Sequence, residues 1–542
     1  MISFSHPPMT RSIERESQSK STNKESGALG ETMPPEASRP PLQTLCKDLE
    51  GHRNLIIASN RGPIDYSLNE AGNLKGRRGS GGVVTVLSAL SQYMDLTWIA
   101  SAMGEGDRRA SELAHGRRFK APIQGHNLHL RFVASSGSTY YQFYSVICNP
   151  LLWFLQHHMW NSSHTPNIDA RVRTAWENGY KPVNQTIAEA VIAEASDSEL
   201  PPLVMLHDYH LYLAAGYIRE QIPNAIIHHF THIPWPGARY WQLLSRDMCD
   251  SICRGLCASD IVGLQTQEDV HNFLHTCEVF IEGAEVDYRE RNILLDGRQI
   301  KVRSYPVSVD VTNLRRQVRS PLFKEYGEKL QPYLGEKTIV RVDRLEPSKN
   351  IVRGFRAFDM LLQRHPDLQG KVRFLAFLVP TRSRIKQYKR YAEEVDEAIV
   401  AINNKYGNDE WQPITVFYEN NYTQALAAMR LYDVLLVNPV ADGMNLVAKE
   451  GPMVNTQDGV LVLSETAGAF EQLGKSALSV TPCDLEGTAD ALYRALSMSP
   501  EEKSQRAAAM KQSIEEEDLS WWLHRQLSDV TALALEQIQQ TT

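Results

Sequence analysis

The chain has 542 residues, 42% of them hydrophobic and 22% charged, which is typical of a globular protein and argues against a wholly disordered or fibrous chain. Its 57 lysines and arginines against 64 aspartates and glutamates give a formal net charge of −7, which argues against nucleic acid as the main partner. Because no apolar run approaches the ~18 residues of a membrane span and the start lacks the pattern of a signal peptide, we expect a cytoplasmic protein without a membrane partner.

The first 52 residues are rich in serine, glutamate, lysine and proline. Such a composition offers too little apolar surface to form a core. We therefore predict a disordered N-terminal tail over residues 1–52.

Short apolar runs then alternate with amphipathic helical stretches as far as about residue 325. The predicted strands lie at 54–59, 203–206, 225–230 and 261–264. The predicted helices lie at 83–93, 183–195 and 211–221. This alternation is typical of an α/β protein with a parallel sheet, and it predicts a first Rossmann-like domain over 53–325.

A polar linker near 311–335 precedes a second series of the same kind. Strands are predicted at 338–342, 372–379, 414–418, 434–437 and 460–463, and helices at 351–364 and 387–406. This series predicts a second Rossmann-like domain over 326–499. The remaining residues, 500–542, form a long helical segment that we expect to cross back to the first domain.

Three of the seven cysteines, Cys249, Cys253 and Cys257, recur every four residues and so share one face of a helix. A zinc site would need a further ligand at tight spacing, and none is evident. We expect reduced, packed thiols and no metal.

Two doubly wound domains bind ligands beyond the carboxyl ends of their strands, so polar residues there are the candidates. Ser59-Asn60-Arg61 follows the first predicted strand, and Gly79-Ser80-Gly81-Gly82 follows soon after. Glycines let backbone amides approach a phosphate, and an arginine fork matches its oxygens. Plain packing and a surface salt bridge are the alternatives.

Two neighbouring strand ends in the first half also carry polar rings. They are His207-Asp208-Tyr209-His210 and Thr231-His232-Ile233-Pro234-Trp235-Pro236. A single histidine at such a place is usually structural. Two in succession favour a pocket.

The second half carries two further clusters. Arg344 and Lys349 flank a turn that enters a helix, and two cations beside a helix N-terminus suit a diphosphate. Asp442 and Glu450 lie at the start of another helix, where carboxylates can accept hydrogen bonds from sugar hydroxyls while the amides of 443–446 donate. A solvated charge pair and a simple helix cap are the alternatives.

Together these stretches resemble the trehalose-6-phosphate synthase family of retaining, metal-independent GT-B glycosyltransferases, from about residue 54 to residue 522. The most specific matches are His207-Asp208-Tyr209-His210, His232-Ile233-Pro234, Arg344 with Lys349, and the run from Asp442 to Glu450. The resemblance implies a GT-B fold, in which two Rossmann-like domains face a cleft and the C-terminal helix crosses back.

The resemblance also implies roles for individual residues. The donor diphosphate would be held by Gly81, Gly82, Arg344 and Lys349. The ribose would be held by Glu450, and the donor glucose by Asp442, Gly443, Met444, Asn445 and Leu446. The transferred sugar would lie against His232, which completes a catalytic set with Asp208, Arg344, Lys349 and Asp442.

On the acceptor side, the resemblance implies that Asp208 lies near the acceptor hydroxyls. The family positions for the acceptor phosphate match Arg61, Tyr144 and Trp153, the last two through their spacing around Asn149. A further family arginine matches either Arg382 or Arg384.

The expected reaction is transfer of glucose from UDP-glucose, or another NDP-glucose, to glucose 6-phosphate, which gives α,α-trehalose 6-phosphate. For this family the leaving phosphate is inferred to accept the acceptor's proton, so no enzyme nucleophile and no cofactor are expected. Because only a helical segment follows the second domain, we expect a separate phosphatase downstream. A homo-oligomer is left open.

Several positions depart from the synthase pattern. Leu345-Glu346-Pro347-Ser348-Lys349-Asn350 stands where the family usually has Leu-Asp-Tyr-Ser-Lys-Gly. Trp98-Ile99-Ala100-Ser101, Trp235, and Pro347 with Asn350 resemble the validoxylamine-phosphate synthases, which couple a nucleotide-linked cyclitol to an aminocyclitol phosphate. The alternatives are therefore another phosphorylated acceptor, such as a cyclitol phosphate or glycerol 3-phosphate, and a catalytically silent regulator that keeps the fold.

Overall fold

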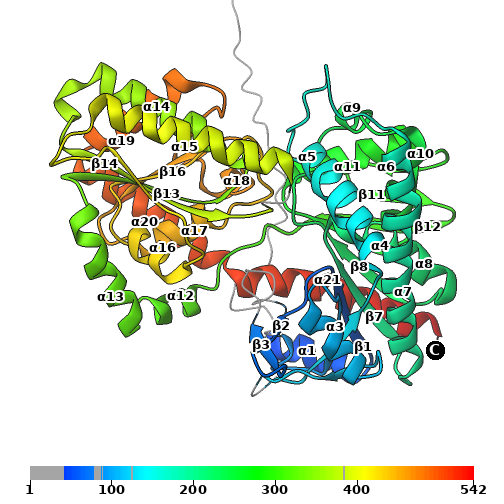
Figure 1. The fold of residues 1–542 in the computed structure, drawn as a ribbon. Coiled ribbons are helices and arrows are strands. Elements are labelled where there is room, and N and C mark those ends of the chain that lie inside the picture. The colour runs from blue at the N-terminus through cyan, green and yellow to red at the C-terminus, as the bar shows by residue number, and fades with distance from the viewer. Residues whose placement is uncertain (1–41, 79–86, 88–89, 124–125, 383–384, 542) are drawn as a thin grey trace, which may run out of the picture. The chain divides into compact units, whose positions relative to one another are not determined.

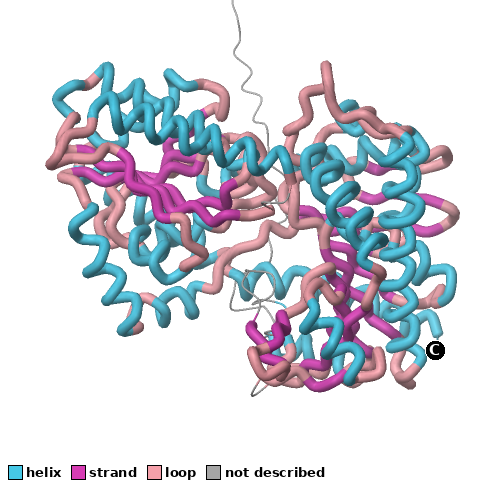
Figure 2. The backbone as a smooth tube through the Cα atoms, viewed as in Figure 1, coloured by secondary structure: helices cyan, strands magenta, loops and turns pink. Residues whose placement is uncertain are grey.

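Two large β-sheets organise the described part of the chain, with helices packed on both faces of each (Figures 1 and 2). The computed structural model describes residues 42–78, 87, 90–123, 126–382 and 385–541. The chain divides into residues 1–41 and residues 42–542, and everything that follows concerns the second unit. Gly81, Gly82, Arg384 and most of the helix expected at 83–93 lie outside the described residues.

The first sheet has ten strands in the order β10-β11-β12-β9-β8-β7-β1-β4-β6-β5 within the described part of the chain. The strands from β12 to β6 in this order run parallel, and antiparallel pairs close both edges. The strands are β1 (Asn54–Ser59), β4 (Leu96–Ser101), β5 (Phe119–Lys120), β6 (Leu128–Val133), β7 (Pro202–His207), β8 (Ile226–Phe230), β9 (Ile261–Leu264), β10 (Glu285–Asp287), β11 (Asn292–Leu295) and β12 (Arg298–Ser304). With its helices, this sheet is called the first lobe.

The helices of the first lobe connect these strands, and a hairpin, β2 (Ile64–Leu68) with β3 (Leu74–Arg78), lies beside them. The helices are α3 (Glu105–Leu113), α4 (Gly137–Tyr141), η2 (Gln142–Leu152), α5 (Trp153–Gln156), α6 (Ala170–Ala175), η3 (Trp176–Tyr180), α7 (Lys181–Ser196), η4 (Tyr209–Leu211), α8 (Ala214–Gln221), α9 (Ala238–Trp241), α10 (Arg246–Cys257) and α11 (Gln267–Phe280).

The second sheet, with its helices, is called the second lobe. Its strand order is β15-β14-β13-β16-β17-β18, and all pairs are parallel. The strands are β13 (Lys337–Leu345), β14 (Val372–Pro380), β15 (Ile414–Phe417), β16 (Val434–Val437), β17 (Val460–Ser464) and β18 (Leu478–Val480). The helices are α12 (Val311–Gln317), α13 (Pro321–Leu330), η5 (Gln331–Tyr333), η6 (Pro347–Lys349), α14 (Ile351–Arg364), η7 (Pro366–Leu368), α15 (Lys386–Tyr406), α16 (Tyr422–Met429), α17 (Val447–Val454), α18 (Phe470–Leu473), α19 (Leu485–Ser497) and α20 (Pro500–Glu516).

Alternate residues of the central strands enter separate hydrophobic cores, which is why both sheets are covered on two faces. In β1, Leu55 and Ile57 join one core while Ile56 and Ala58 join another. Such strands are apolar at every position, so the sequence predicts them well. The strands predicted from the sequence in both lobes are confirmed, and they share the parallel pairing expected of doubly wound domains.

The expected crossing of the C-terminal segment is confirmed, although the segment breaks at Glu517 and Asp518. Helix α20 packs on the second lobe, and α21 (Leu519–Thr541) contacts β8 and α1 (Leu42–Glu50) of the first lobe (Figure 1, red). The indole Nε1 of Trp522 donates to the carbonyl of Tyr305 at 3.0 Å. Helices α20 and α21 together therefore join the two lobes.

The prediction of disorder through residue 52 is wrong for its last part. Residues 42–50 form α1 (Leu42–Glu50), in which Leu45, Cys46 and Leu49 are buried. Just beyond it, Arg53 donates to the carbonyl of Ala534 at 3.4 Å, which ties this segment to α21. Helix α1 is stable because its apolar face packs against α21. The composition of residues 1–52 could not show this, because α21 lies more than 450 residues further along the chain.

The expected domain boundary at 325 and 326 falls inside α13. Helices α12 and α13 pack against α17 and α16 of the second lobe, and Phe323 and Leu330 of α13 are buried. The second lobe thus begins near Val311, at the N-terminal end of the segment that we interpreted as a linker.

Two smaller expectations concern α10 and the membrane. Cys249, Cys253 and Cys257 are all buried in α10, so their role as packed thiols is confirmed. Among the helices that the structure describes, none has both the length and the hydropathy needed to cross a membrane.

Candidate active site

The carboxyl end of β13 positions the two predicted cations of the second lobe. After β13 the chain makes the short turn η6, and Asn350 takes up a left-handed conformation with φ 57° before α14 begins. The Asn350 side chain holds this turn by donating to the carbonyls of Asn438 at 3.0 Å and Pro482 at 2.7 Å. Lys349 emerges from the turn and forms an ion pair with Asp442.

Asp442 lies in the loop before α17, where two donors hold its carboxylate. Lys349 Nζ donates to Oδ2, and Asn445 Nδ2 donates to the same oxygen at 3.0 Å. Burial alone would raise the pKa of Asp442, but Lys349, with smaller contributions from His157 and Arg344, outweighs it, so the pKa lies below its ordinary value. Asp442 is therefore ionised at neutral pH.

A cavity of about 350 Å³ opens between the strand ends of the two lobes. Its lining contains most of the residues predicted for the donor and the transferred sugar. The lining residues are His232, Gln265, Val307, Val342, Asp343, Arg344, Lys349, Val379, Asp442, Met444, Asn445, Leu446 and Val447. Cations, carboxylates and apolar side chains thus surround one space of the size expected for a ligand pocket.

Gly443 lies where the two lobes touch. A Cβ atom at this position would stand 2.3 Å from the carbonyl oxygen of His232. The Asp442 loop can approach the His232 loop this closely only because residue 443 has no side chain. Gly443 therefore sets the distance between the loops.

His232 and Asp208 face each other at the ends of β8 and β7. The backbone N–H of His232 donates to Asp208 Oδ1 at 3.3 Å, and Asp208 has a φ of 75°, a left-handed conformation unusual for a residue with a side chain. His207 Nδ1 lies 3.2 Å from His232 Nε2. Backbone strain of this kind clusters at functional sites.

His207 and His232, at the carboxyl ends of β7 and β8, are neutral at physiological pH. Burial lowers the pKa of His232 to about 4, against a smaller opposing effect of Asp208. Burial also holds the pKa of His207 well below its ordinary value. His232 can therefore donate or accept a hydrogen bond next to the cavity without carrying charge.

The predicted acceptor residues Trp153 and Arg382 are in contact. The guanidinium carbon of Arg382 lies 4.0 Å from the Trp153 ring centroid, and that of Arg344 lies 5.2 Å from it. Arg382 also donates to the hydroxyl of Tyr388 at 2.6 Å. A break of the helix at Asn149, with φ −130° and ψ 100°, precedes the helical turn that begins at Trp153.

Tyr144 joins the same region through a stacked pair of rings, whereas Arg61 stands apart. Tyr144 lies parallel to His210 at 6.1 Å between centroids, and His210 Nδ1 lies 3.5 Å from Asp208 Oδ2. Arg61 pairs with Asp65 at 3.6 Å, and 57% of its side chain is exposed. The described structure thus groups Tyr144, Trp153, Asp208 and Arg382 more closely than Arg61.

Glu450 lies on α17 next to the loop but does not line the cavity. It accepts a hydrogen bond from the Tyr422 hydroxyl at 2.7 Å. Burial raises the pKa of Glu450, and this hydrogen bond partly offsets the effect.

Sequence reasoning missed Gln265 and Glu346. Gln265 follows β9 directly, and its side chain donates to the carbonyl of His232 at 3.2 Å while accepting from the N–H of Val307 at 3.0 Å. Its position at a strand end was the available signal. Glu346 stands between the two predicted cations and pairs with Arg344 at 3.0 Å.

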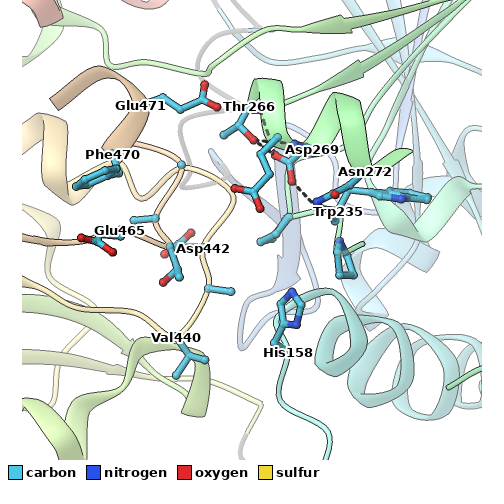
Figure 3. Close-up of a pocket in the computed structure, with 17 residues that line it drawn as sticks. His158, Trp235, Thr266, Asp269, Asn272, Val440, Asp442, Glu465, Phe470 and Glu471 are labelled. Atoms are coloured by element: carbon cyan, nitrogen blue, oxygen red, sulfur yellow. Dashed lines mark hydrogen bonds between the residues drawn. The ribbon is translucent and has the colours of Figure 1, made fainter. Parts of the chain in front are cut away.

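A second cavity, of about 390 Å³, shares Asp442 with the first (Figure 3). Asp269 lines it and accepts from the N–H of Trp235 at 2.6 Å, and burial raises its pKa to about 7. Glu471 of the second lobe accepts from the N–H of Gln267, at the start of α11, at 2.9 Å. This cavity therefore adjoins a contact between the lobes. In the described residues, no group of three or more histidine, cysteine, aspartate or glutamate side chains is arranged to hold a metal ion.

Comparison with known proteins identifies relatives along nearly the whole chain. Residues 53–532 match the model of glycosyltransferase family 20. A trehalose-6-phosphate synthase of Citrobacter koseri is 30% identical over 491 residues, which cover 89% of this chain and 95% of that protein. A validamine 7-phosphate valienyltransferase of Streptomyces hygroscopicus subsp. jinggangensis is 28% identical over 479 residues, which cover 88% and 94%.

Solved structures agree with these matches. The Escherichia coli protein described as bound with UDP-2-fluoro glucose is 26% identical, with a TM-score of 0.75 over 88% of this chain and 99% of that chain. A synthase of Burkholderia xenovorans in complex with glucose-6-phosphate is 26% identical, with a TM-score of 0.73 and the same coverage. With two facing parallel-sheet lobes, a cavity between their strand ends and a family match over residues 53–532, the chain belongs to glycosyltransferase family 20 and is a GT-B glycosyltransferase.

Proposed function

We propose that this chain transfers glucose from UDP-glucose to glucose 6-phosphate and so forms α,α-trehalose 6-phosphate with retention at the transferred carbon. The observation that carries the proposal is the convergence of Arg344, Lys349 and Asp442 on one cavity opposite His232. Relatives named trehalose-6-phosphate synthase, and solved structures holding a UDP-glucose analogue or glucose-6-phosphate, support the same substrates.

In this proposal, the cavity of about 350 Å³ receives the donor. Arg344 and Lys349 bind the diphosphate, and Asp442 with the amides of 443–446 binds glucose hydroxyls. Glu450, just outside the cavity lining, binds the ribose, because the Tyr422 hydroxyl occupies its Oε1 and leaves Oε2 as an acceptor. Gly81 and Gly82 keep their expected diphosphate role as a prediction.

The chemical step follows from where charge develops. The bond from the glucose anomeric carbon to the UDP oxygen breaks, and a bond from that carbon to the anomeric oxygen of the acceptor forms. The acceptor's proton passes to the departing phosphate oxygen. Arg344 and Lys349 stabilise the growing negative charge on UDP more strongly in the transition state than in the ground state. Because His232 is neutral, it can contact the sugar without adding charge.

On the acceptor side, the proposal assigns the sugar phosphate to the cluster around Trp153. Arg382 has a side chain that is 10% exposed, and its guanidinium is fixed on the ring, so it is preorganised to bind a phosphate. Asp208 faces the acceptor hydroxyls, and Tyr144 adds a stacked ring beside it. Arg61 completes the site only if its exposed side chain turns toward the cluster.

The test is an assay of purified protein with a panel of donors and acceptors. UDP-glucose with glucose 6-phosphate is expected to release UDP and to yield trehalose 6-phosphate. A cyclitol phosphate, validamine 7-phosphate and glycerol 3-phosphate form the comparison set, since one relative is a validamine 7-phosphate valienyltransferase. If UDP is released with one of these acceptors but not with glucose 6-phosphate, that compound is the acceptor instead. If no donor releases its nucleotide with any acceptor, the proposal is wrong. A cytoplasmic location, a homo-oligomer and a separate downstream phosphatase remain predictions.

A further inference from the structure

Glu346 is a fully buried carboxylate that lies between two arginines. Its Oε1 lies 3.0 Å from Arg344 Nη2, and its Oε2 lies 3.6 Å from Arg382 Nη1. Ser348 Oγ donates to Oε1 at 3.2 Å. The Glu346 side chain has 0% exposure and Arg382 has 10%, whereas Arg344 has 44%, so solvent reaches this group of charges mainly from the Arg344 side.

Both arginines also lie near one aromatic ring. The guanidinium carbons of Arg382 and Arg344 stand 4.0 Å and 5.2 Å from the centroid of Trp153. Strand pairing explains this meeting, because β13 and β14 run in parallel register and end together at Leu345 and Pro380. Glu346 and Arg382 come one and two residues after these strand ends, so the sheet itself brings them together.

The buried charge of Glu346 depends on the cations around it. Burial would raise the pKa of Glu346, but Arg344, Lys349 and Arg382 outweigh it, so the pKa lies below its ordinary value and the carboxylate stays charged. A buried charge is costly unless it is paired. In the described structure Oε2 has no hydrogen-bond donor, and the Arg382 guanidinium is its nearest recorded compensation.

We propose that Glu346 is a positioning residue that fixes Arg344 and Arg382 relative to each other, and so sets the spacing between the donor diphosphate and the acceptor phosphate. The inference rests on the proposed function, which gives these two arginines to the two substrates. The carboxylate occupies one side of each guanidinium and leaves the remaining N–H groups to the phosphates. No other carboxylate in the described structure pairs with both arginines.

This role predicts a particular kinetic pattern. Glu346→Gln keeps the shape but removes the charge that holds the guanidiniums, and a misplacement of about 1 Å can cost on the order of 10²-fold in rate. We expect kcat to fall by about 10-fold to 100-fold. The KM values for UDP-glucose and glucose 6-phosphate should stay within about twofold of wild type or fall, because the carboxylate no longer competes with phosphates for positive charge.

A matched control is available in the first lobe. Asp260 also bridges two arginines, at 2.7 Å to Arg219 and 3.1 Å to Arg298, but it precedes β9 at the end of the sheet opposite the cavity. Asp260→Asn is expected to leave kcat and both KM values within about twofold of wild type, whatever it does to thermal stability. A second test is a double-mutant cycle of Glu346→Gln with Arg382→Lys, in which the two effects on kcat should fall well short of multiplying.

Glu346→Asp keeps the charge but is one methylene shorter, so it cannot keep both contacts. Its kcat should fall at least threefold and lie between those of wild type and Glu346→Gln, and this variant carries the test if the glutamine variant does not fold. Any of three results would overturn the inference. A folded variant at position 346 could keep the wild-type kcat, or the two effects in the double-mutant cycle could multiply. The third is a variant that loses active protein but keeps the wild-type kcat per UDP-binding site. An inactive wild-type protein would instead count against the proposed function.

Discussion

The two walls of the cavity differ in how they treat charge. On the second lobe, the cations and carboxylates are paired, as in Lys349 with Asp442 and Arg344 with Glu346. On the first lobe, His207 is buried and His232 is half-buried, and the two rings are neutral and in contact with each other. Both walls are rich in polar groups, but only one carries a dense set of full charges.

This difference matches the two tasks of a glycosyl transfer. A departing nucleoside diphosphate gains negative charge and needs preorganised cations, whereas the sugar is uncharged and needs hydrogen bonds. The charged wall should therefore control the rate of the chemical step. The neutral wall should show itself mainly in the pH dependence of stability.

The largest expected effect is on the charged wall. Lys349→Ala or Arg344→Ala should each lower kcat/KM by about 10²-fold to 10³-fold, the usual result of removing one preorganised group that stabilises transition-state charge. Steady-state kinetics with UDP-glucose measure it. Lys405→Ala, which removes an exposed partner of Asp359, is the control and should change nothing. If both site variants keep a turnover within threefold of wild type, the charged wall does not control the chemical step and the comparison between the walls is wrong.

The next prediction concerns the place where the walls touch. Gly443→Ala would put a Cβ 2.3 Å from the backbone oxygen of His232, so the loops must separate and activity should fall at least about 10-fold. In Gly216→Ala a Cβ meets nothing within 4 Å and lies inside α8, where alanine favours the helix. Equal activities of the two variants would show that the loops can move apart freely.

A smaller effect is expected behind the neutral wall, at the buried His228 of β8, the strand that leads to His232. Burial lowers the pKa of His228 to about 3, and its two ring nitrogens have no hydrogen-bond partner in the described structure. Below pH ~6.5 the unfolded chain binds a proton at this residue that the folded chain does not, so stability falls as pH falls. At pH 5 this amounts to about 2 kcal/mol for His228.

His228→Phe should remove this loss of stability at low pH. Relative to wild type, the variant should gain about 2 kcal/mol in free energy of unfolding between pH 7 and pH 5, measured by urea denaturation at both pH values. The comparison with wild type cancels carboxyls such as Asp269, whose raised pKa acts in the opposite direction. The exposed His164 provides the control substitution, His164→Phe, which should show no such gain.

The smallest effect is expected at the edge of the charged wall. Tyr422→Phe removes the hydroxyl that donates to Glu450 at 2.7 Å. A single hydrogen bond contributes about 1 kcal/mol, so the Kd for UDP should change by about fivefold or less, with kcat nearly unchanged. Calorimetric titration with UDP measures it, and a loss larger than that found for Lys349→Ala would contradict the ranking.

Much of this fold could be predicted because parallel strands buried on both faces are apolar at every position, as in β1, β7, β13 and β16. The β2–β3 hairpin could not be predicted, because β2 mixes apolar and polar residues and only its first residue is buried. Helix α1 was missed because its partner α21 is at the other end of the chain.

The site divides in the same way. Lys349, Asp442 and His232 stand out because each follows a strand, Arg344 because it lies at the carboxyl end of β13, and strand ends meet at one edge. Glu346 could not be assigned because its significance depends on Arg382, which only the pairing of β13 with β14 brings beside it.

A crystal structure of the protein with UDP tests the central claim most directly. We expect the nucleotide in the cavity of about 350 Å³, with nitrogen atoms of Arg344 and Lys349 within hydrogen-bond distance of diphosphate oxygens and Asp442 close to the place where glucose is attached. A bound nucleotide outside this cavity, or one whose phosphates contact neither Arg344 nor Lys349, would contradict the account.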